Sequence, residues 1–184
     1  MQESRKREIR IKADSFRENC KIGRYGIIDL FKDCTRCGYK LLRYPLGEST
    51  DLGFSLLKDQ DIIIFTNSSS RLSREIFTLA HEIGHIYIGH LEVIEGAEIA
   101  YNEQRGFYDQ FESEADYFAW NLLAPLPILR EMGIRSASEI KATYGLSNQA
   151  AALQFDRYTK WCRGHVKTAW ENGMLRIFRS KYMA

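Results

Sequence analysis

The pattern of hydrophobic and polar positions changes its period along the chain, with helix-like ends on either side of a short strand-like middle. Near the start, apolar residues recur at helical spacing in residues 5–19 and again in residues 26–37. Three short apolar runs bounded by Gly, Pro or polar residues then predict strands at residues 39–44, 53–57 and 61–66. The short polar connection between the last two strands predicts an antiparallel hairpin.

A long amphipathic helix is predicted over residues 71–90, after a polar stretch, residues 67–70, that supplies candidate N-cap residues. Gly84 lies inside this helix, where Gly is about 1 kcal/mol less favourable than Ala. We therefore expect another helix or backbone segment to approach closely at Gly84. The apolar positions keep helical spacing and predict one side packed on the core; they are Ile76, Leu79, Ala80, Ile83 and Tyr87.

The remainder of the chain is predicted to be mostly helical. Residues 91–108 show no clear period and are interpreted as a loop region. A second strong helix is predicted over residues 109–123, and it stops before Pro125 and Pro127. Three further helical segments follow, at residues 128–132, 138–144 and 147–161.

Composition adds little that is specific. With 184 residues and 45% hydrophobic content, the chain is expected to form one domain, with N-terminal helices (1–38), a central core (39–125) and a C-terminal helical extension (126–184). A net charge of +2 gives no case for a nucleic-acid or membrane surface. No apolar run reaches the ~18 residues of a membrane span. The basic start is not followed by an apolar stretch, so no secretory signal is expected and the predicted location is the cytoplasm.

The four cysteines are predicted to be reduced, structural thiols. Cys34 and Cys37 form a C-x-x-C, which is half of a zinc ribbon or a redox pair in other settings. Cys20 and Cys162 are isolated and far apart in the sequence, so they supply no second pair for a zinc ribbon. The C-x-x-C also lies at the end of a predicted helix rather than at the start of one, as a thioredoxin-like motif would require.

The clearest chemistry is in the segment His81-Glu82-Ile83-Gly84-His85. Residues four apart share one face of a helix, so His81 and His85 can hold one metal ion from a single rigid element. Glu82 is positioned to take a proton from a metal-bound water. This is the H-E-x-x-H arrangement of zinc metallopeptidases. The alternative is a pair of ordinary surface histidines on an amphipathic helix.

A catalytic zinc has three protein ligands and one open position, so a third ligand must come from outside this helix. Glu112 and Asp116 are four residues apart and share one face of the second strong helix, while Glu114 points roughly away from their midpoint. We assign Glu112 as the third ligand, and Asp116 as the hydrogen-bond acceptor that orients a ligand histidine. Glu114 stays open as an alternative ligand, and favourable charges at a helix N-terminus are the interpretation without a metal.

His90 is a further alternative for the third ligand. Metzincins use H-E-x-x-H-x-x-G-x-x-H, which would require Gly at position 88 and His at position 91. The chain has Ile88 and Leu91 there, with Gly89 and His90 one residue out of register in each case. The metzincin ligand set is therefore excluded, and we expect His90 to line the cleft or to cap the helix C-terminus.

These motifs resemble those of the ImmA/IrrE family of metallopeptidases. The matching segments are IFTLAHEIGH at residues 76–85, ESEADYFA at 112–119 and LLAP at 122–125. The family pattern is close to F-T-L-A-H-E-x-G-H, followed by E-x-E-A-[ND]-x-F-A-x-x-L-L-M-P. Ala124 stands where the family usually has Met, a packing change that leaves the chemistry unaffected.

The resemblance implies a zincin-like α+β fold, in which a small antiparallel sheet packs on the active-site helix and helices flank both ends. It implies one catalytic Zn²⁺, held by two His and one Glu. It also implies a protein substrate, a helix-turn-helix transcriptional repressor, in phage, mobile-element or stress regulation.

On that ligand set we predict a zinc metalloendopeptidase, in which zinc polarises the scissile carbonyl and Glu82 transfers the proton. Candidate donors to the tetrahedral intermediate are Tyr101, Tyr108 and His90, in or beside the aperiodic segment. A substrate strand is expected to add to the sheet edge near residues 62–66.

A different function is indicated by residues 138–151, where a Gly in the turn and a Ser-Asn-Gln helix start resemble a helix-turn-helix unit. The protein would then be a DNA- or repressor-binding regulator with a structural or sensory zinc and no peptidase activity. The presumed recognition helix has only Arg157 and Lys160, both late in it, so nucleic-acid binding is disfavoured. We interpret this segment as a packing or partner-docking module.

Overall fold

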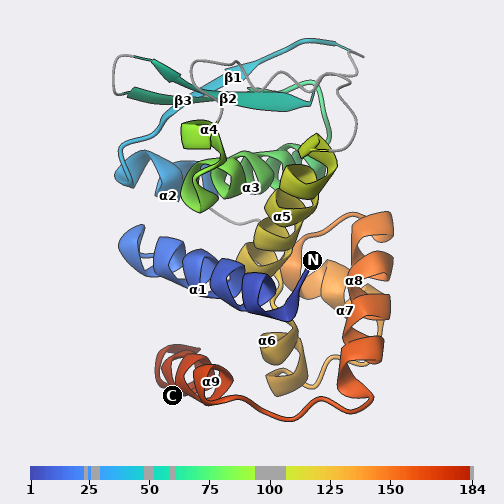
Figure 1. The fold of residues 1–184 in the computed structure, drawn as a ribbon. Helices are drawn as coiled ribbons and strands as arrows, with labels where there is room; N and C mark the ends of the chain where they lie inside the picture. Colours follow the sequence, from blue (N-terminus) through green and yellow to red (C-terminus); the bar gives the residue numbers. More distant parts are fainter. Residues whose placement is uncertain (23–24, 26–29, 48–51, 59–60, 94–106, 183–184) are drawn as a thin grey trace.

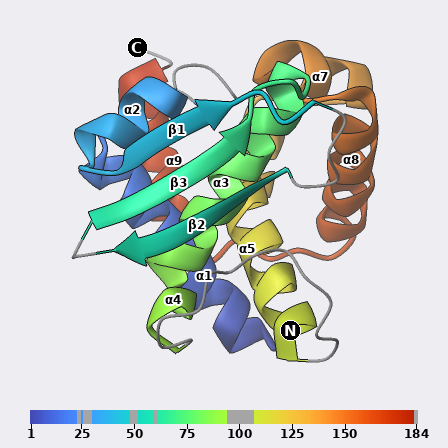
Figure 2. The ribbon, with the colours of Figure 1, turned by 90° about the horizontal axis from the view of Figure 1, so that it is seen from above.

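A three-stranded sheet forms the outer layer of the protein in the computed structural model, which describes residues 1–22, 25, 30–47, 52–58, 61–93 and 107–182 (Figure 1). Its strands are β1 (Lys40–Tyr44), β2 (Gly53–Lys58) and β3 (Asp61–Asn67), in the order β1-β3-β2 (Figure 2). β2 and β3 form the predicted antiparallel hairpin, with Phe54 opposite Phe65. The two rings stack with centroids 4.4 Å apart, a cross-strand contact that stabilises this pairing.

The sheet is mixed rather than antiparallel. β1 runs parallel to β3, with Leu42 opposite Phe65. The expectation of a purely antiparallel sheet is therefore wrong for β1, because β3 lies between β1 and β2, the two strands that are neighbours in the sequence. Local periodicity predicts a hairpin between adjacent strands but carries no information on which strand occupies the middle.

The position of the free sheet edge differs from the prediction as well. Residues 62–66 belong to β3, which is paired on both sides, so no further strand can add there. The edge strand on the side of the long helices is β2, which contacts α3 (Leu72–Ile88). An extended peptide that adds to the sheet on this side would have to pair with β2.

The two long amphipathic helices, α3 and α5 (Phe107–Leu123), pack directly on each other beneath the sheet (Figure 1). α3 ends at Gly89, which adopts a left-handed conformation with φ of 92°. A Cβ atom built on Gly84 would lie 3.1 Å from Cα of Ala115 and 3.2 Å from Cβ of Phe118. The close approach predicted at Gly84 is confirmed, and it allows the two helices to meet without an intervening side chain.

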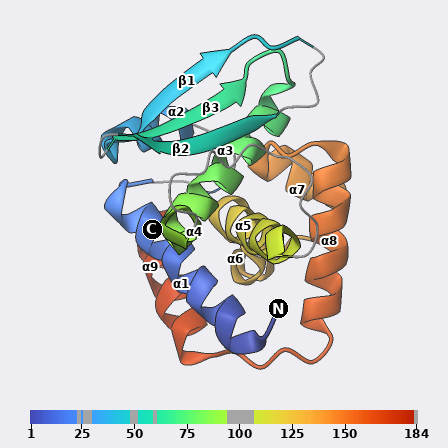
Figure 3. The ribbon, with the colours of Figure 1, turned by 45° about the horizontal axis from the view of Figure 1, so that its top comes forward.

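The other helices surround this pair. α1 (Glu3–Asn19) packs on α5, and Phe16 brings its ring to within 5.3 Å of Tyr87 and 6.3 Å of Phe118 (centroid distances). α7 (Ala137–Tyr144) and α8 (Asn148–Cys162) form a helical hairpin on one flank of α5 (Figure 3). The remaining helices are α2 (Leu30–Arg36), α4 (His90–Val93), α6 (Leu126–Glu131) and α9 (Ala169–Tyr182). Within the residues that the structure describes, no helix combines the length and apolar character needed to cross a membrane.

Helix α9 lies within the predicted C-terminal helical extension (126–184), but its bounds were not predicted from the sequence. It buries Met174, Leu175 and Phe178 against Ile128 of α6. These positions, with Trp170, recur at helical spacing, so the signal was present in the amphipathic pattern.

The cysteines correct a further prediction. Cys20, directly after α1, and Cys37, directly after α2, form a disulfide bond, with their Cα atoms 5.4 Å apart. The prediction of reduced thiols is wrong for this pair, because the sequence does not show that these two helix ends meet. Cys34 and Cys162 are free, and burial raises the pKa of the Cys34 thiol, which makes it a poor nucleophile.

Candidate metal centre

Three side chains with metal-ligand chemistry converge where α3 and α5 cross. The Nε2 atoms of His81 and His85 are 3.0 Å apart. One oxygen of Glu112 lies 3.1 Å from Nε2 of His81, and its other oxygen lies 3.3 Å from Nε2 of His85. Both histidines are buried, with 8% and 1% of their surface exposed. They are therefore not the ordinary surface histidines of the alternative interpretation.

The geometry of these ligand atoms fits a zinc ion. Tetrahedral zinc with bonds of about 2.0–2.1 Å places its ligand atoms about 3.3 Å from one another. The separations of 3.0, 3.1 and 3.3 Å are close to that value. Oε2 of Glu112 is also buried without a well-oriented hydrogen bond, although it lies 3.1 Å from Nε2 of His81. Two nitrogens and one carboxylate are a set that zinc accepts in catalytic sites.

The opposite ring nitrogen of His81 is held by Asp116. Nδ1 of His81 lies 2.9 Å from Oδ1 of Asp116, one turn along α5 from Glu112. Because a carboxylate can only accept, Nδ1 carries the hydrogen and Nε2 keeps its lone pair for a metal. Asp116 thus lies within hydrogen-bond distance of one of the two histidines, as its helical spacing from Glu112 predicts.

His85 has a comparable support that the sequence did not show. Its Nδ1 lies 3.0 Å from Nδ1 of His90, and Nε2 of His90 lies 3.1 Å from Oε2 of Glu114. Arg5 of α1 donates to the same oxygen from Nε at 3.0 Å and Nη2 at 2.6 Å. With Glu114 as the terminal acceptor, His90 donates from Nε2 and accepts at Nδ1, so His85 donates from Nδ1 and keeps Nε2 free. We call Arg5, Glu114 and His90 the supporting chain.

In the supporting chain, Glu114 and His90 do not occupy the positions of a third metal ligand or of a donor to the tetrahedral intermediate. Glu114 is buried and bound by Arg5 and His90, away from the convergence of ligand atoms. His90 lies behind His85, on the side opposite to Nε2, so it is poorly placed to reach a substrate oxygen. The predicted loop, residues 91–108, is wrong at both ends, because residues 91–93 belong to α4 and residues 107–108 to α5. Of the other candidate donors, Tyr101 lies outside the described residues, as do residues 94–106 as a whole. Tyr108 is in the first turn of α5, and its side chain is not described.

The charges around His81 and Glu112 favour a cation between them. Burial alone would lower the pKa of His81, but Asp116, Glu112 and Glu82 outweigh it and raise that pKa to about 10. Burial alone would raise the pKa of Glu112, but the two imidazoles outweigh it and lower that pKa to about 2. Positive charge is thus stabilised between these groups, which is what a divalent ion would supply.

In the supporting chain, the pKa values of Glu114 and His90 are both lowered, so the acid is charged and the imidazole is neutral. Burial would raise the pKa of Glu114, but hydrogen bonds from Arg5, Gln110 and His90 lower it to about 2. Burial lowers the pKa of His90 to about 4, so its ring is neutral at neutral pH. A neutral imidazole between a carboxylate and His85 is consistent with the donor directions given above.

Glu82 faces the cleft beside the ligand atoms. It is buried, burial raises its pKa, and it accepts a hydrogen bond of 2.8 Å from Oγ of Ser55 on β2. A cavity of about 90 Å³ adjoins it. The cavity is lined by Leu52, Gly53, Phe77, Thr78, His81, Glu82 and Asp116. A carboxylate with a raised pKa at such a position is suited to accept a proton near neutral pH.

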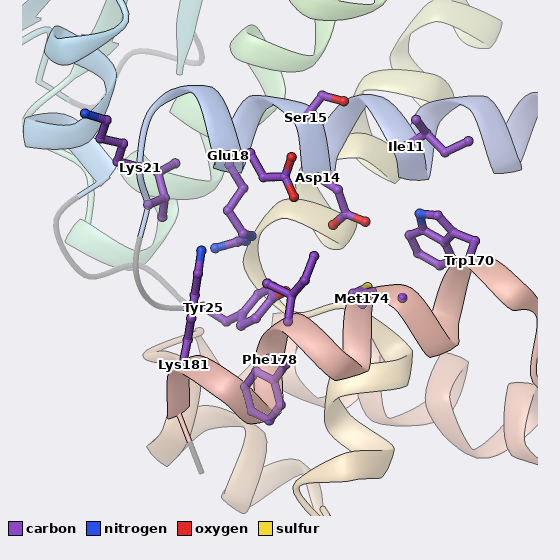
Figure 4. A pocket seen from close by; sticks show the side chains of 14 residues that line it. Ile11, Asp14, Ser15, Glu18, Lys21, Tyr25, Trp170, Met174, Phe178 and Lys181 are labelled. Atoms are coloured by element: carbon purple, nitrogen blue, oxygen red, sulfur yellow. The ribbon is translucent and has the colours of Figure 1, made fainter. Parts of the chain in front are cut away.

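A separate, more apolar cavity of about 480 Å³ lies between α1 and α9 (Figure 4). Asp14, Trp170 and Met174 line it, and it shares no lining residue with the cavity beside Glu82. It contains no group of ligand atoms comparable to that of α3 and α5 among the residues that the structure describes. Cavity size therefore does not identify the chemical site in this protein.

Comparison with known proteins agrees with the metal-ligand geometry. Residues 34–155, about two thirds of the chain, match the Peptidase_M78 family model, described as the IrrE N-terminal-like domain. The matched segment contains α3 and α5, and hence every ligand atom described above. No curated protein matches the chain. The chain belongs to the family of IrrE N-terminal-like metallopeptidase domains.

Proposed function

We propose that this protein is a zinc metalloendopeptidase whose zinc is held by His81, His85 and Glu112. The observation that carries the proposal is the convergence of the two Nε2 atoms and the Glu112 carboxylate at 3.0–3.3 Å, beside the buried carboxylate of Glu82. Zinc in this position supplies a Lewis acid for the scissile carbonyl and a water of lowered pKa.

Protein side chains transfer the proton and orient the ligand histidines. Glu82 takes a proton from the attacking water and passes it to the leaving amine, and Ser55 orients its carboxylate. Asp116 orients His81, and the supporting chain orients His85. Tyr101 and Tyr108 remain the predicted donors to the tetrahedral intermediate.

The substrate is proposed from the resemblance to the ImmA/IrrE family. It is a cytoplasmic helix-turn-helix transcriptional repressor, in phage, mobile-element or stress regulation. A repressor encoded next to the gene of this protein is the first substrate to test.

The decisive experiment compares the unsubstituted protein with Glu82→Gln, both loaded with zinc and mixed with that repressor. We expect Glu82→Gln to keep one zinc per chain and to lose cleavage by about 10²–10⁴-fold, because it removes the proton acceptor but no ligand. Glu18→Gln, an exposed change on α1, is the matched control and should cleave normally.

Two results would contradict the proposal. Full cleavage by Glu82→Gln would exclude its role as the base. Retained zinc without cleavage of any adjacent repressor, together with salt-dependent binding of duplex DNA, would instead support the regulator with a structural or sensory zinc.

A further inference from the structure

A third hollow, of about 790 Å³, adjoins the cavity beside Glu82. It shares Leu52, Phe77 and Asp116 with the cavity beside Glu82. Phe77 of α3 and Trp120 of α5 line it together, with ring centroids 4.9 Å apart. A peptide bound at Glu82 can therefore extend into this hollow without leaving the protein surface.

Three arginines face this hollow from two helices. Arg71 and Arg74 come from the start of α3, and Arg157 comes from α8, where its guanidinium lies 4.9 Å from the ring centroid of Trp120. None of the three forms an ion pair within the described part of the chain. Asp116 is the one carboxylate among the described lining residues, and it is bound to His81.

Residues from two helix N-termini also line the hollow. Its lining includes Ser70 and Ser73 at the start of α3 and Ser147 and Gln149 at the start of α8. The N-cap residue of α3, Arg71, makes no side-chain capping hydrogen bond. Since helix N-termini favour anions, their effect adds to that of the arginines.

We propose that this hollow is a subsite for acidic side chains of the substrate. The inference rests on the proposed peptidase function and names the chemistry of the segment that is cleaved. α3 rises about 1.5 Å per residue, so Arg74 and Arg71 begin about 10 and 15 Å from His81. An extended chain advances about 3.3 Å per residue, which places Asp or Glu about three to five residues from the scissile bond.

The proposal also gives a role to the segment that resembles a helix-turn-helix unit. Ser147, Gln149, Ala150 and Leu153 at the start of α8 line the hollow. The first turns of the presumed recognition helix thus form one wall of the cleft. This arrangement favours docking of a peptide over insertion into a DNA groove.

The test measures binding separately from cleavage, using the zinc-loaded full chain with Glu82→Gln. The probes are two fluorescein-labelled peptides of about nine residues, one with two glutamates in an Ala/Gly frame and one with glutamines in their place. We expect the glutamate peptide to bind at least about tenfold more tightly by fluorescence anisotropy. Combining Arg71→Ala, Arg74→Ala and Arg157→Ala should abolish that preference.

The matched control combines Arg163→Ala, Lys167→Ala and Arg176→Ala, which removes the same charge from exposed positions outside the hollow. It should keep the preference for glutamate. Equal affinity for the two peptides, no measurable binding of the glutamate peptide, or equal loss in both triple variants would overturn the proposal. Tighter binding of a labelled DNA duplex through the same three arginines would overturn it too.

The same measurements separate the two proposals from each other. Selective glutamate binding without hydrolysis by the unsubstituted protein would reject the peptidase function and keep the acidic subsite. Hydrolysis of a repressor without any preference for glutamate would support the peptidase function and reject the acidic subsite.

Discussion

The metal centre and the cavity between α1 and α9 both hold a partly buried carboxylate, yet the pKa values of the two carboxylates are shifted in opposite directions. The pKa of Glu112 is lowered to about 2, whereas the pKa of Asp14 is raised to about 6. Burial raises the pKa in both places. The two regions therefore differ in the partners that surround the acid rather than in how deeply it is buried.

Those partners explain the chemistry of each region. Glu112 faces two imidazoles from one turn of α3, and they outweigh burial. Asp14 is helped only in part by the charge of Arg17 and a hydrogen bond from Trp170, and burial dominates. The comparison teaches that α3 and α5 bring basic partners to a buried acid, whereas α1 and α9 enclose an acid that burial dominates. Three substitutions test this difference.

The largest effect is expected from Glu112→Gln. Loss of a ligand carboxylate should weaken zinc binding by more than about 100-fold, the upper end of what the loss of an outer-shell partner costs. Competition with a chromophoric chelator measures the affinity. Asp109→Asn, an exposed change at the start of the same helix, should leave it unchanged. Unaltered zinc affinity in Glu112→Gln would exclude Glu112 as the third ligand.

A smaller loss is expected from Glu114→Gln, which removes the charged acceptor at the end of the supporting chain. His85 should keep its place but lose part of its orientation, so zinc affinity should fall by about 10–100-fold. Ser113→Ala, an exposed neighbour on α5, is the control. If the metal-free protein loses thermal stability while zinc affinity stays the same, the chain of Arg5, Glu114 and His90 is structural and does not position His85.

The smallest effect is expected from a substitution of Asp14, which should stabilise the protein rather than impair it. Because the folded-state pKa of about 6 exceeds the unfolded value of about 3.9, the folded state favours the protonated acid. The contribution of Asp14 to stability is therefore greatest below about pH 4 and is lost as the pH rises through about 6.

Asp14→Asn should thus increase the free energy of unfolding at pH 7 by about 1–2 kcal/mol, less than the full shift implies because the side chain is partly exposed. At pH 4 it should have little effect. Urea unfolding at the two pH values measures both numbers, and Asp156→Asn, at an exposed site on α8, provides the control. A gain of equal size at both pH values would show that the carboxylate is not the destabilising group.

The amino-acid sequence alone was sufficient for features contained within one element or one hairpin. The period of α3 places His81 and His85 on one face, and the spacing in α5 places Glu112 and Asp116 on another, so half of the metal-centre geometry follows from helix geometry. The hairpin of β2 and β3 and the helices α1, α5, α7 and α8 lie within two residues of their predicted bounds.

The contacts between helices and strands, by contrast, were decided only by the tertiary structure. The parallel pairing of β1, the disulfide of Cys20 with Cys37 and the bond from Arg5 to Glu114, 109 residues away, have no local signature. The same holds for the meeting of Arg157 with the start of α3 in one hollow. Local periodicity determines which side chains share a face, but the packing of whole helices and strands determines which faces meet.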